Sequence, residues 1–152
     1  FKRLLINLFT MNYESYHTHP INKFIHFICI PVIVLTSCNL LSFVKVKTDF
    51  ITLELQELLT FFMLINYATY GFKVLLVMSI YFFFIHTISF IMRAKPNWVK
   101  HSIILFLLSW CAQFLGHVIE GNRPALMTSI TQAFTEAPLF SVSYILPFKL
   151  TI

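Results

Sequence analysis

The sequence predicts an all-α, polytopic membrane protein, with about four transmembrane helices in a bundle and an interfacial C-terminal segment. Three properties of the 152 residues predict this fold class: 58% are hydrophobic, only 11% are charged, and the mean hydropathy is +0.79. A soluble domain carries about 25% charged residues on average, so the composition argues against a water-exposed globule. Since a spanning helix uses roughly 20 apolar residues, we expect a single integral membrane domain over residues 1–152.

The first two predicted spans cover residues 21–44 and 54–70. Pro20 begins the first of them, because proline is favoured at the first position of a helix, and the run stays apolar past Pro31. The second span opens with two glutamates and becomes strongly apolar only from Leu58. We expect a short polar link between the two spans.

The last two predicted spans cover residues 74–92 and 101–120. The earlier of these is almost wholly apolar and aromatic, and it follows a tight turn that contains Gly71. The later one ends before Gly121, since glycine commonly follows the last residue of a helix. In residues 125–152 we expect one interfacial helix and a hydrophobic tail, without a fifth span.

The basic residues indicate contact with a lipid bilayer. The net charge is +5, and the 11 Lys and Arg residues stand singly or in pairs between apolar runs. Such scattered cations are typical of headgroup-facing anchors rather than of a nucleic-acid surface. They divide almost evenly between the two predicted membrane faces, so the positive-inside rule does not orient the chain. The pattern is compatible with a bacterial inner membrane or the endoplasmic reticulum, and with an oligomer.

The six histidines are many for so apolar a chain, and their positions indicate one site. Four spans of alternating direction bring the start of the first span and the end of the fourth to the same membrane face. His101 would lie roughly 24 Å from His117 along one helix, so we exclude it from this site. The ionisable side chains expected together are His17, His19, His26, His117 and Glu120.

The fourth predicted span carries a polar stripe. The residues that fall within roughly 80° of one another on this helix are Trp110, Gln113, His117 and Glu120. In a lipid-embedded helix such a stripe must face protein or water, and Gly116 beside it would let another backbone come close. His117 and Glu120 could both bind a metal, or Glu120 could orient the histidine. The alternative is a polar seam that only joins helices.

The third predicted span contains His86 on one arc with Ser79, Ser89 and Arg93. An ionisable residue at this depth is a candidate functional residue, although a neutral histidine hydrogen-bonded to another helix would also explain it. At 1.5 Å per residue, His86 would lie about 18 Å along the helix axis from Val74. It is better placed to line a path below a metal site than to bind the metal, and we keep it as a possible additional ligand.

The segment around the start of the first span packs three imidazoles into a few residues: Tyr13-x-x-Tyr16-His17-x-His19-Pro20-x-Asn22-x-x-x-His26. With a further histidine arriving from the fourth span, this pattern predicts a metal cluster at one membrane face. Imidazole and carboxylate ligands suit iron or zinc, and no set of thiolates accompanies them.

Two motifs resemble those of the fungal endoplasmic-reticulum 2-hydroxy-fatty-acid dioxygenase family and its bacterial relatives. The first is Tyr16-His17-x-x-Pro20-x-Asn22-x-x-x-His26, followed by Ile30-Pro31. The second is Trp110-x-x-Gln113-Phe114-x-Gly116-His117, followed by Arg123-Pro124-Ala125-Leu126. The motifs have the same order and about the same separation as in that family, and the resemblance covers about residues 13–140.

The resemblance implies a non-haem Fe(II)-dependent membrane dioxygenase that uses molecular oxygen to shorten 2-hydroxy fatty acids by one carbon, an alpha-oxidation. In fungi this reaction serves the breakdown of the sphingolipid base phytosphingosine. The family's histidines fall on His17, His26 and His117, the implied catalytic and iron-binding residues. Two positions depart from the fungal pattern: His19 stands where that branch has Asn, and Glu120 follows His117 by one residue fewer. Both are kept as possible additional ligands.

A 2-hydroxy acid could chelate an iron through its carboxylate and hydroxyl groups and leave one position for oxygen. Lys23 and Arg123 lie near the same predicted face and could hold the carboxylate. The remaining candidate substrate-binding residues are Asn22, Gln113 and Tyr16.

Three other functions fit parts of the pattern. A haem- or quinone-binding electron carrier would use His26 and His117 as axial ligands. A non-enzymatic membrane scaffold would use the polar seams only to join helices. A divalent-metal transporter would need ligands near the middle of the membrane, whereas these histidines gather at one end.

Overall fold

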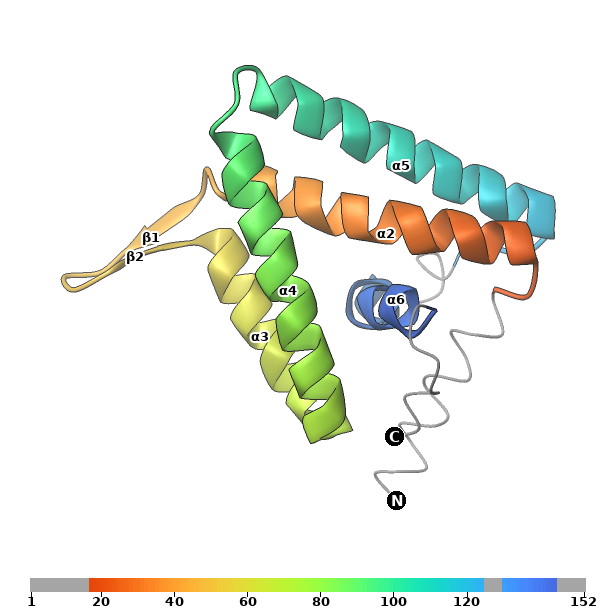
Figure 1. Ribbon diagram of the computed structural model, residues 1–152, viewed down its shortest axis with the longest axis horizontal. Helices are drawn as coiled ribbons and strands as arrows, with labels where there is room; N and C mark the ends of the chain where they lie inside the picture. Colours follow the sequence, from red (N-terminus) through yellow and green to blue (C-terminus); the bar gives the residue numbers. More distant parts are fainter. Residues whose placement is uncertain (1–16, 125–129, 145–152) are drawn as a thin grey trace. The chain divides into compact units, whose positions relative to one another are not determined.

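The computed structural model describes residues 17–124 and 130–144, and within the second range the side chains from residue 134 onward. The described part contains five helices and one small hairpin (Figure 1), which confirms the all-α class. The helices are α2 (Pro20–Leu41), α3 (Leu55–Tyr70), α4 (Phe72–Arg93), α5 (Trp98–Glu120) and α6 (Ile130–Ser143), and the strands are β1 (Lys45–Lys47) and β2 (Thr52–Glu54).

The chain forms two compact units. The first combines Phe1–Pro31 with Ser109–Ile152, and the second is Val32–Leu108. The first half of α2, the last part of α5 and α6 therefore belong to one unit, whereas α3, α4 and the hairpin belong to the other. The expectation of one integral membrane domain stays a prediction.

Three of the helices, α2, α4 and α5, are long and apolar enough to cross a membrane, with 22, 22 and 23 residues. They coincide with the first, third and fourth predicted spans. Pro20 is the first residue of α2 and Pro31 lies within it, as the sequence predicts. Gly121, with a φ of 76°, follows the last residue of α5.

The second predicted span is a shorter helix than the other three. α3 has 16 residues, about 24 Å at 1.5 Å per residue, which is less than the roughly 30 Å of a bilayer's hydrocarbon core. It begins after Glu54, whose backbone N–H donates to the Glu57 side chain at 2.8 Å in a capping box. The two glutamates that open the segment therefore form the N-terminal cap of this helix.

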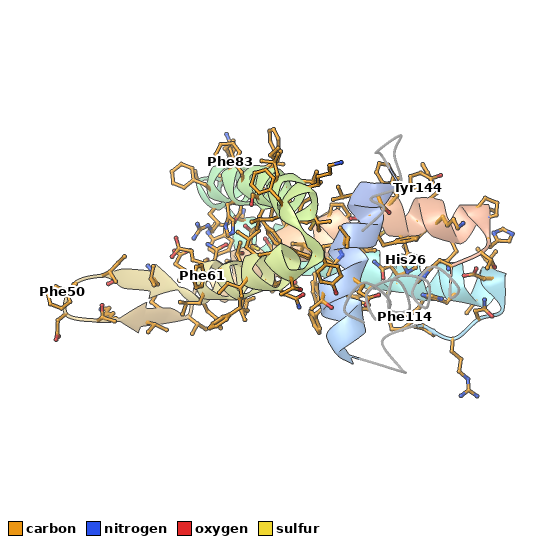
Figure 2. All side chains as sticks on the ribbon, turned by 90° about the horizontal axis from the view of Figure 1, so that it is seen from below. His26, Phe50, Phe61, Phe83, Phe114 and Tyr144 are labelled. Atoms are coloured by element: carbon orange, nitrogen blue, oxygen red, sulfur yellow. The ribbon has the colours of Figure 1, made fainter. Side chains whose placement is uncertain are left out.

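An antiparallel hairpin stands where the sequence predicted only a polar link. Val46 of β1 pairs with Leu53 of β2, and the backbone N–H of Thr48 donates to the carbonyl of Ile51 at 2.9 Å to close the turn. Figure 2 shows Phe50 at the tip, where it is 98% exposed. Strands of three residues carry too little alternating pattern to be recognised in a sequence.

An ion pair joins the hairpin to the end of α4. Arg93 donates to both carboxylate oxygens of Glu54, at 2.9 and 3.0 Å. Burial raises the pKa of Glu54, but the hydrogen bonds and charge of Arg93 outweigh burial and leave the pKa below its ordinary value.

Helices α3 and α4 pack side by side as an antiparallel pair (Figure 1). Gly71 between them has a φ of 117°, a conformation that glycine adopts without the steric cost of a Cβ atom. The pair buries Tyr67 against Phe82. His86 of α4 shares a hydrogen bond of 2.9 Å with Thr60 of α3, which matches the reading of a neutral histidine bonded to another helix.

A buried polar network joins three helices in the same unit. The Asn39 side chain of α2 donates to Ser102 of α5 at 2.9 Å and accepts from Ser89 of α4 at 2.6 Å. All three side chains are fully buried. Such interhelical bonds orient apolar helices, because lipid offers these groups no other partner.

We therefore expect Asn39→Leu to lower the free energy of unfolding by about 1–2 kcal/mol. The measurement is unfolding in detergent micelles, followed by circular dichroism. Ser79→Ala is the control, since the Ser79 hydroxyl donates to Leu75 within its own helix at 2.7 Å. If the two variants have the same free energy of unfolding, the Asn39 network does not contribute to the stability of the fold.

Candidate metal centre

The start of α2 is held by His19. Its carbonyl accepts the first helical hydrogen bond, from the Lys23 N–H at 3.0 Å. Its ring Nδ1 accepts from the backbone N–H of Ile21 at 3.3 Å, as a side chain that caps a helix does. Nδ1 of His19 thus serves the helix terminus, and the residue stands outside the histidine cluster described below.

His26 lies two turns into α2 and is only 1% exposed. Its Nδ1 lies 3.0 Å from the carbonyl of Asn22. Because a carbonyl only accepts, Nδ1 must carry the proton, and Nε2 keeps a lone pair. This is the tautomer and second hydrogen bond that metal-binding histidines usually have.

Three buried histidines meet at this end of the helices. His17, His26 and His117 each offer a ring nitrogen, and these atoms lie within 4.8 Å of one another. The ring centroids are 4.3 Å apart for His17 and His26, 5.0 Å for His17 and His117, and 4.9 Å for His26 and His117. We call these three side chains the histidine triad.

The triad fits a metal ion by its chemistry. Buried polar atoms are normally hydrogen-bonded, yet Nδ1 of His117 is buried without a hydrogen-bond partner in the described part of the chain. The three neutral imidazoles each offer one ring nitrogen with a lone pair. A divalent cation such as iron or zinc would satisfy them.

Glu120 binds the N-terminus of α2. Its carboxylate accepts from the Thr18 hydroxyl and the His19 backbone N–H, both at 2.8 Å, and also from the Thr18 backbone N–H and the Asn22 side chain. A negative charge is favourable there, because the first N–H groups of a helix lack partners and carry its positive dipole end. We interpret Glu120 as a residue that positions His17, rather than as a ligand.

Gly116 allows another backbone to approach α5 closely, as expected, and the structure identifies that backbone as α2. A Cβ atom on Gly116 would overlap Oδ1 of Asn22 and lie 3.2 Å from Cγ of Asn22 and 3.3 Å from Cδ1 of Ile25. The next residue, His117, is therefore carried against the side of α2 that presents His26.

Helix α6 belongs to the same unit and packs close to the triad, a role that the sequence did not predict. The Phe140 ring lies 5.1 Å from the His17 ring, and the Tyr144 ring lies 5.2 Å from the Phe27 ring. On the same helix Glu136 is buried, and burial raises its pKa to about 7. The only signal in the sequence was a carboxylate within an otherwise uncharged helix.

The other predicted site residues lie in several places. Gln113 is buried one turn before His117, and its Nε2 has no hydrogen-bond partner among the described residues. Lys23 is half-buried and Arg123 is exposed. Tyr16 falls outside the described residues. His86, with its bond to Thr60, and the exposed His101 belong to the Val32–Leu108 unit rather than to the unit that holds the triad.

Fold and site together define a class: helical proteins with membrane-length apolar helices and a buried three-histidine centre. Comparison with known proteins gives the family. The chain matches the family model described as "2-hydroxy-palmitic acid dioxygenase Mpo1-like" over residues 6–148, and it belongs to this Mpo1-like family.

A curated relative is the "2-hydroxy-palmitic acid dioxygenase MPO1" of Saccharomyces cerevisiae. The two are 32% identical over 132 residues, which cover 84% of this chain and 72% of the relative. No solved structure matches the chain.

Replacing Gly116 by alanine should separate α2 from α5. We expect Gly116→Ala to destabilise the protein by about 1–3 kcal/mol, as overpacking does, and to lower the amount of metal that the protein retains after purification. Both are measured in detergent, by thermal unfolding and by elemental analysis. Val118→Ala, at an exposed position two residues further along α5, should behave as the wild type. If Gly116→Ala is as stable as the wild type and retains as much metal, the close approach of the two helices is unnecessary.

Replacing Glu120 by glutamine should loosen the His17 segment while leaving all three histidines in place. We expect Glu120→Gln to weaken metal binding about 10–100-fold, as loss of a group that orients a ligand does. Competition with a chelator of known affinity measures this change. An unchanged metal affinity would show that the carboxylate only caps the helix.

Proposed function

We propose that this protein is a non-haem Fe(II)-dependent dioxygenase that removes one carbon from 2-hydroxy fatty acids by alpha-oxidation. The observation that carries the proposal is the buried triad of His17, His26 and His117, in a chain whose yeast relative is named a 2-hydroxy-palmitic acid dioxygenase. The overall reaction balances without a further reductant: a 2-hydroxy acid and O₂ become the acid one carbon shorter, CO₂ and water.

The triad would hold the iron. Three neutral imidazoles leave coordination positions free, and Fe(II) bound there would supply the electrons that activate oxygen. The protein keeps His26 in the required tautomer through the Asn22 carbonyl. Glu120 holds the residues next to His17, and the burial of all three rings limits access of water.

The substrate's polar end would meet polar side chains close to the triad. The buried Gln113 amide has donors to offer, and the cations Lys23 and Arg123 suit a carboxylate. Asn22 acts through Glu120, to which its side chain donates. The acyl chain suits a protein with exposed apolar helices, since both partition into the bilayer of a bacterial inner membrane or the endoplasmic reticulum.

The haem alternative is less well supported by the geometry. His17 lies against both His26 and His117, at 4.3 and 5.0 Å between ring centroids. A porphyrin between His26 and His117 as axial ligands would need the space that His17 fills. The iron of a triad, in contrast, needs the three rings to face one point.

The direct test incubates purified protein with ferrous iron, oxygen and 2-hydroxypalmitate and detects the 15-carbon acid by mass spectrometry. We expect turnover by the wild type and none by His17→Ala, His26→Ala or His117→Ala, which should also lose bound iron. His101→Ala is the matched control, since this exposed histidine should leave iron content and turnover unchanged.

Three results would contradict the proposal. A fully active His117→Ala protein would exclude the triad as the iron site. A Soret absorption band in the purified protein, with no conversion of 2-hydroxypalmitate, would favour the electron carrier. A protein that retains no metal after stringent washing and converts nothing would favour the scaffold.

A further inference from the structure

The carboxyl group of Glu136 in α6 is unusually placed. The residue is only 4% exposed, and Oε2 is buried without a hydrogen-bond partner in the part of the chain that the structure describes. The Glu120 carboxylate in the same unit is instead bonded to two backbone N–H groups and two side chains. Burying a carboxyl oxygen without a partner costs free energy. Such a group therefore points to a ligand that supplies the missing bond.

The position of Glu136 along α6 relates it to the histidine triad. Glu136 and Phe140 are four residues apart in α6, so they lie in one row on the helix surface, and Tyr144 directly follows the last residue of the helix. Phe140 contacts the ring of His17, and Tyr144, labelled in Figure 2, contacts Phe27 of α2. Glu136 is the next member of this row, about 6 Å along the helix from Phe140.

Glu136 is not a fourth member of the metal cluster. The group of side chains whose ligand atoms approach one another consists of the three histidines, and it does not include this carboxylate. Its partner is therefore expected to be an organic ligand that lies between α6 and the triad, rather than the metal ion itself.

We propose that Glu136 is a specificity-determining residue of the substrate site, whose carboxyl group hydrogen-bonds the 2-hydroxyl group of the fatty acid. This inference rests on the proposed function and adds the group that distinguishes a 2-hydroxy acid from an ordinary fatty acid. A hydroxyl donates to an ionised carboxylate and accepts from a protonated one, so it bonds either form. The substrate's own carboxylate is repelled by an ionised Glu136 and suits the cations Lys23 and Arg123 better.

The proposal separates a functional role of Glu136 from a structural one. If the carboxyl group serves to bind a hydroxyl, its burial without a partner destabilises the ligand-free protein. An apolar replacement of Glu136 then leaves the free energy of unfolding equal or raises it. If the group instead held the fold together, an apolar replacement would lower stability. The two roles thus predict opposite changes in the unfolding temperature.

The experiment compares the wild type with Glu136→Leu and Glu136→Gln, all loaded with ferrous iron. Binding of 2-hydroxypalmitate and of palmitate is measured without oxygen, so that affinity is read independently of turnover. We expect Glu136→Leu to bind 2-hydroxypalmitate about tenfold more weakly or worse, as loss of a hydrogen bond to a charged group does. Its affinity for palmitate and its iron content should match the wild type, and its unfolding temperature should be equal or higher.

The second variant and a control complete the test. Glu136→Gln keeps a side chain that can bond a hydroxyl and should retain part of the preference for the 2-hydroxy acid. Ser143→Ala, on the same helix, removes a hydroxyl that donates to the Phe140 carbonyl at 2.8 Å, and it should not change the preference.

Four outcomes would overturn the inference: an unchanged preference in Glu136→Leu, an equal loss of affinity for both acids, a loss of iron, or a lower unfolding temperature. These are distinguishable from a failure of the proposed function. That failure appears as no 15-carbon product from the wild type, whereas the binding preference and its dependence on Glu136 are measured without turnover.

Discussion

The carboxylate of Glu120 at the N-terminus of α2 is the contact on which the candidate site depends. Thr18 and Glu120 are 102 residues apart in the sequence, and this contact brings their helix ends together. His17 immediately precedes Thr18, and His117 lies one turn before Glu120. Once the carboxylate binds the free N–H groups at the start of α2, both histidines are necessarily close, and His26 completes the triad from within the same helix.

Close packing of α5 against α2 adds to this contact. Gly116 lets the two backbones approach until Asn22 lies against α5, and the Asn22 side chain then reaches Glu120 as well. In the Val32–Leu108 unit, the buried hydrogen bonds of Asn39 join three helices.

The sequence predicted the helices well and the irregular elements poorly. Pro20, Gly71 and Gly121 each act through their own backbone chemistry, so the helix boundaries near them could be placed without a structure. The hairpin was missed because its pairing of Lys45 with Glu54 joins segments that have no strand pattern of their own. The capping role of Glu54 was missed for a related reason, since charged residues at the start of an apolar run resemble a weak span.

The site was predicted through helix direction and spacing. His17, His26 and His117 were placed at one end from the alternation of spans, and the Gln113 and His117 stripe from a period of 3.6 residues. The role of Glu120 remained open between ligand and orienting group, because spacing along one helix does not reveal what the neighbouring helix presents. Phe140 and Glu136 were not assigned to the site, because their packing against it depends on where α6 lies.

The sequence by itself determined which segments become helices, which of them suit a lipid solvent, and which face of each helix is polar. These properties follow from local backbone preferences and from the spacing of apolar side chains. The tertiary structure alone decided that Glu120 holds the start of α2, that α5 meets α2 at Gly116, and that α6 packs against His17. Those contacts join residues distant in sequence, and their formation depends on the shape and unpaired polar groups of two surfaces at once.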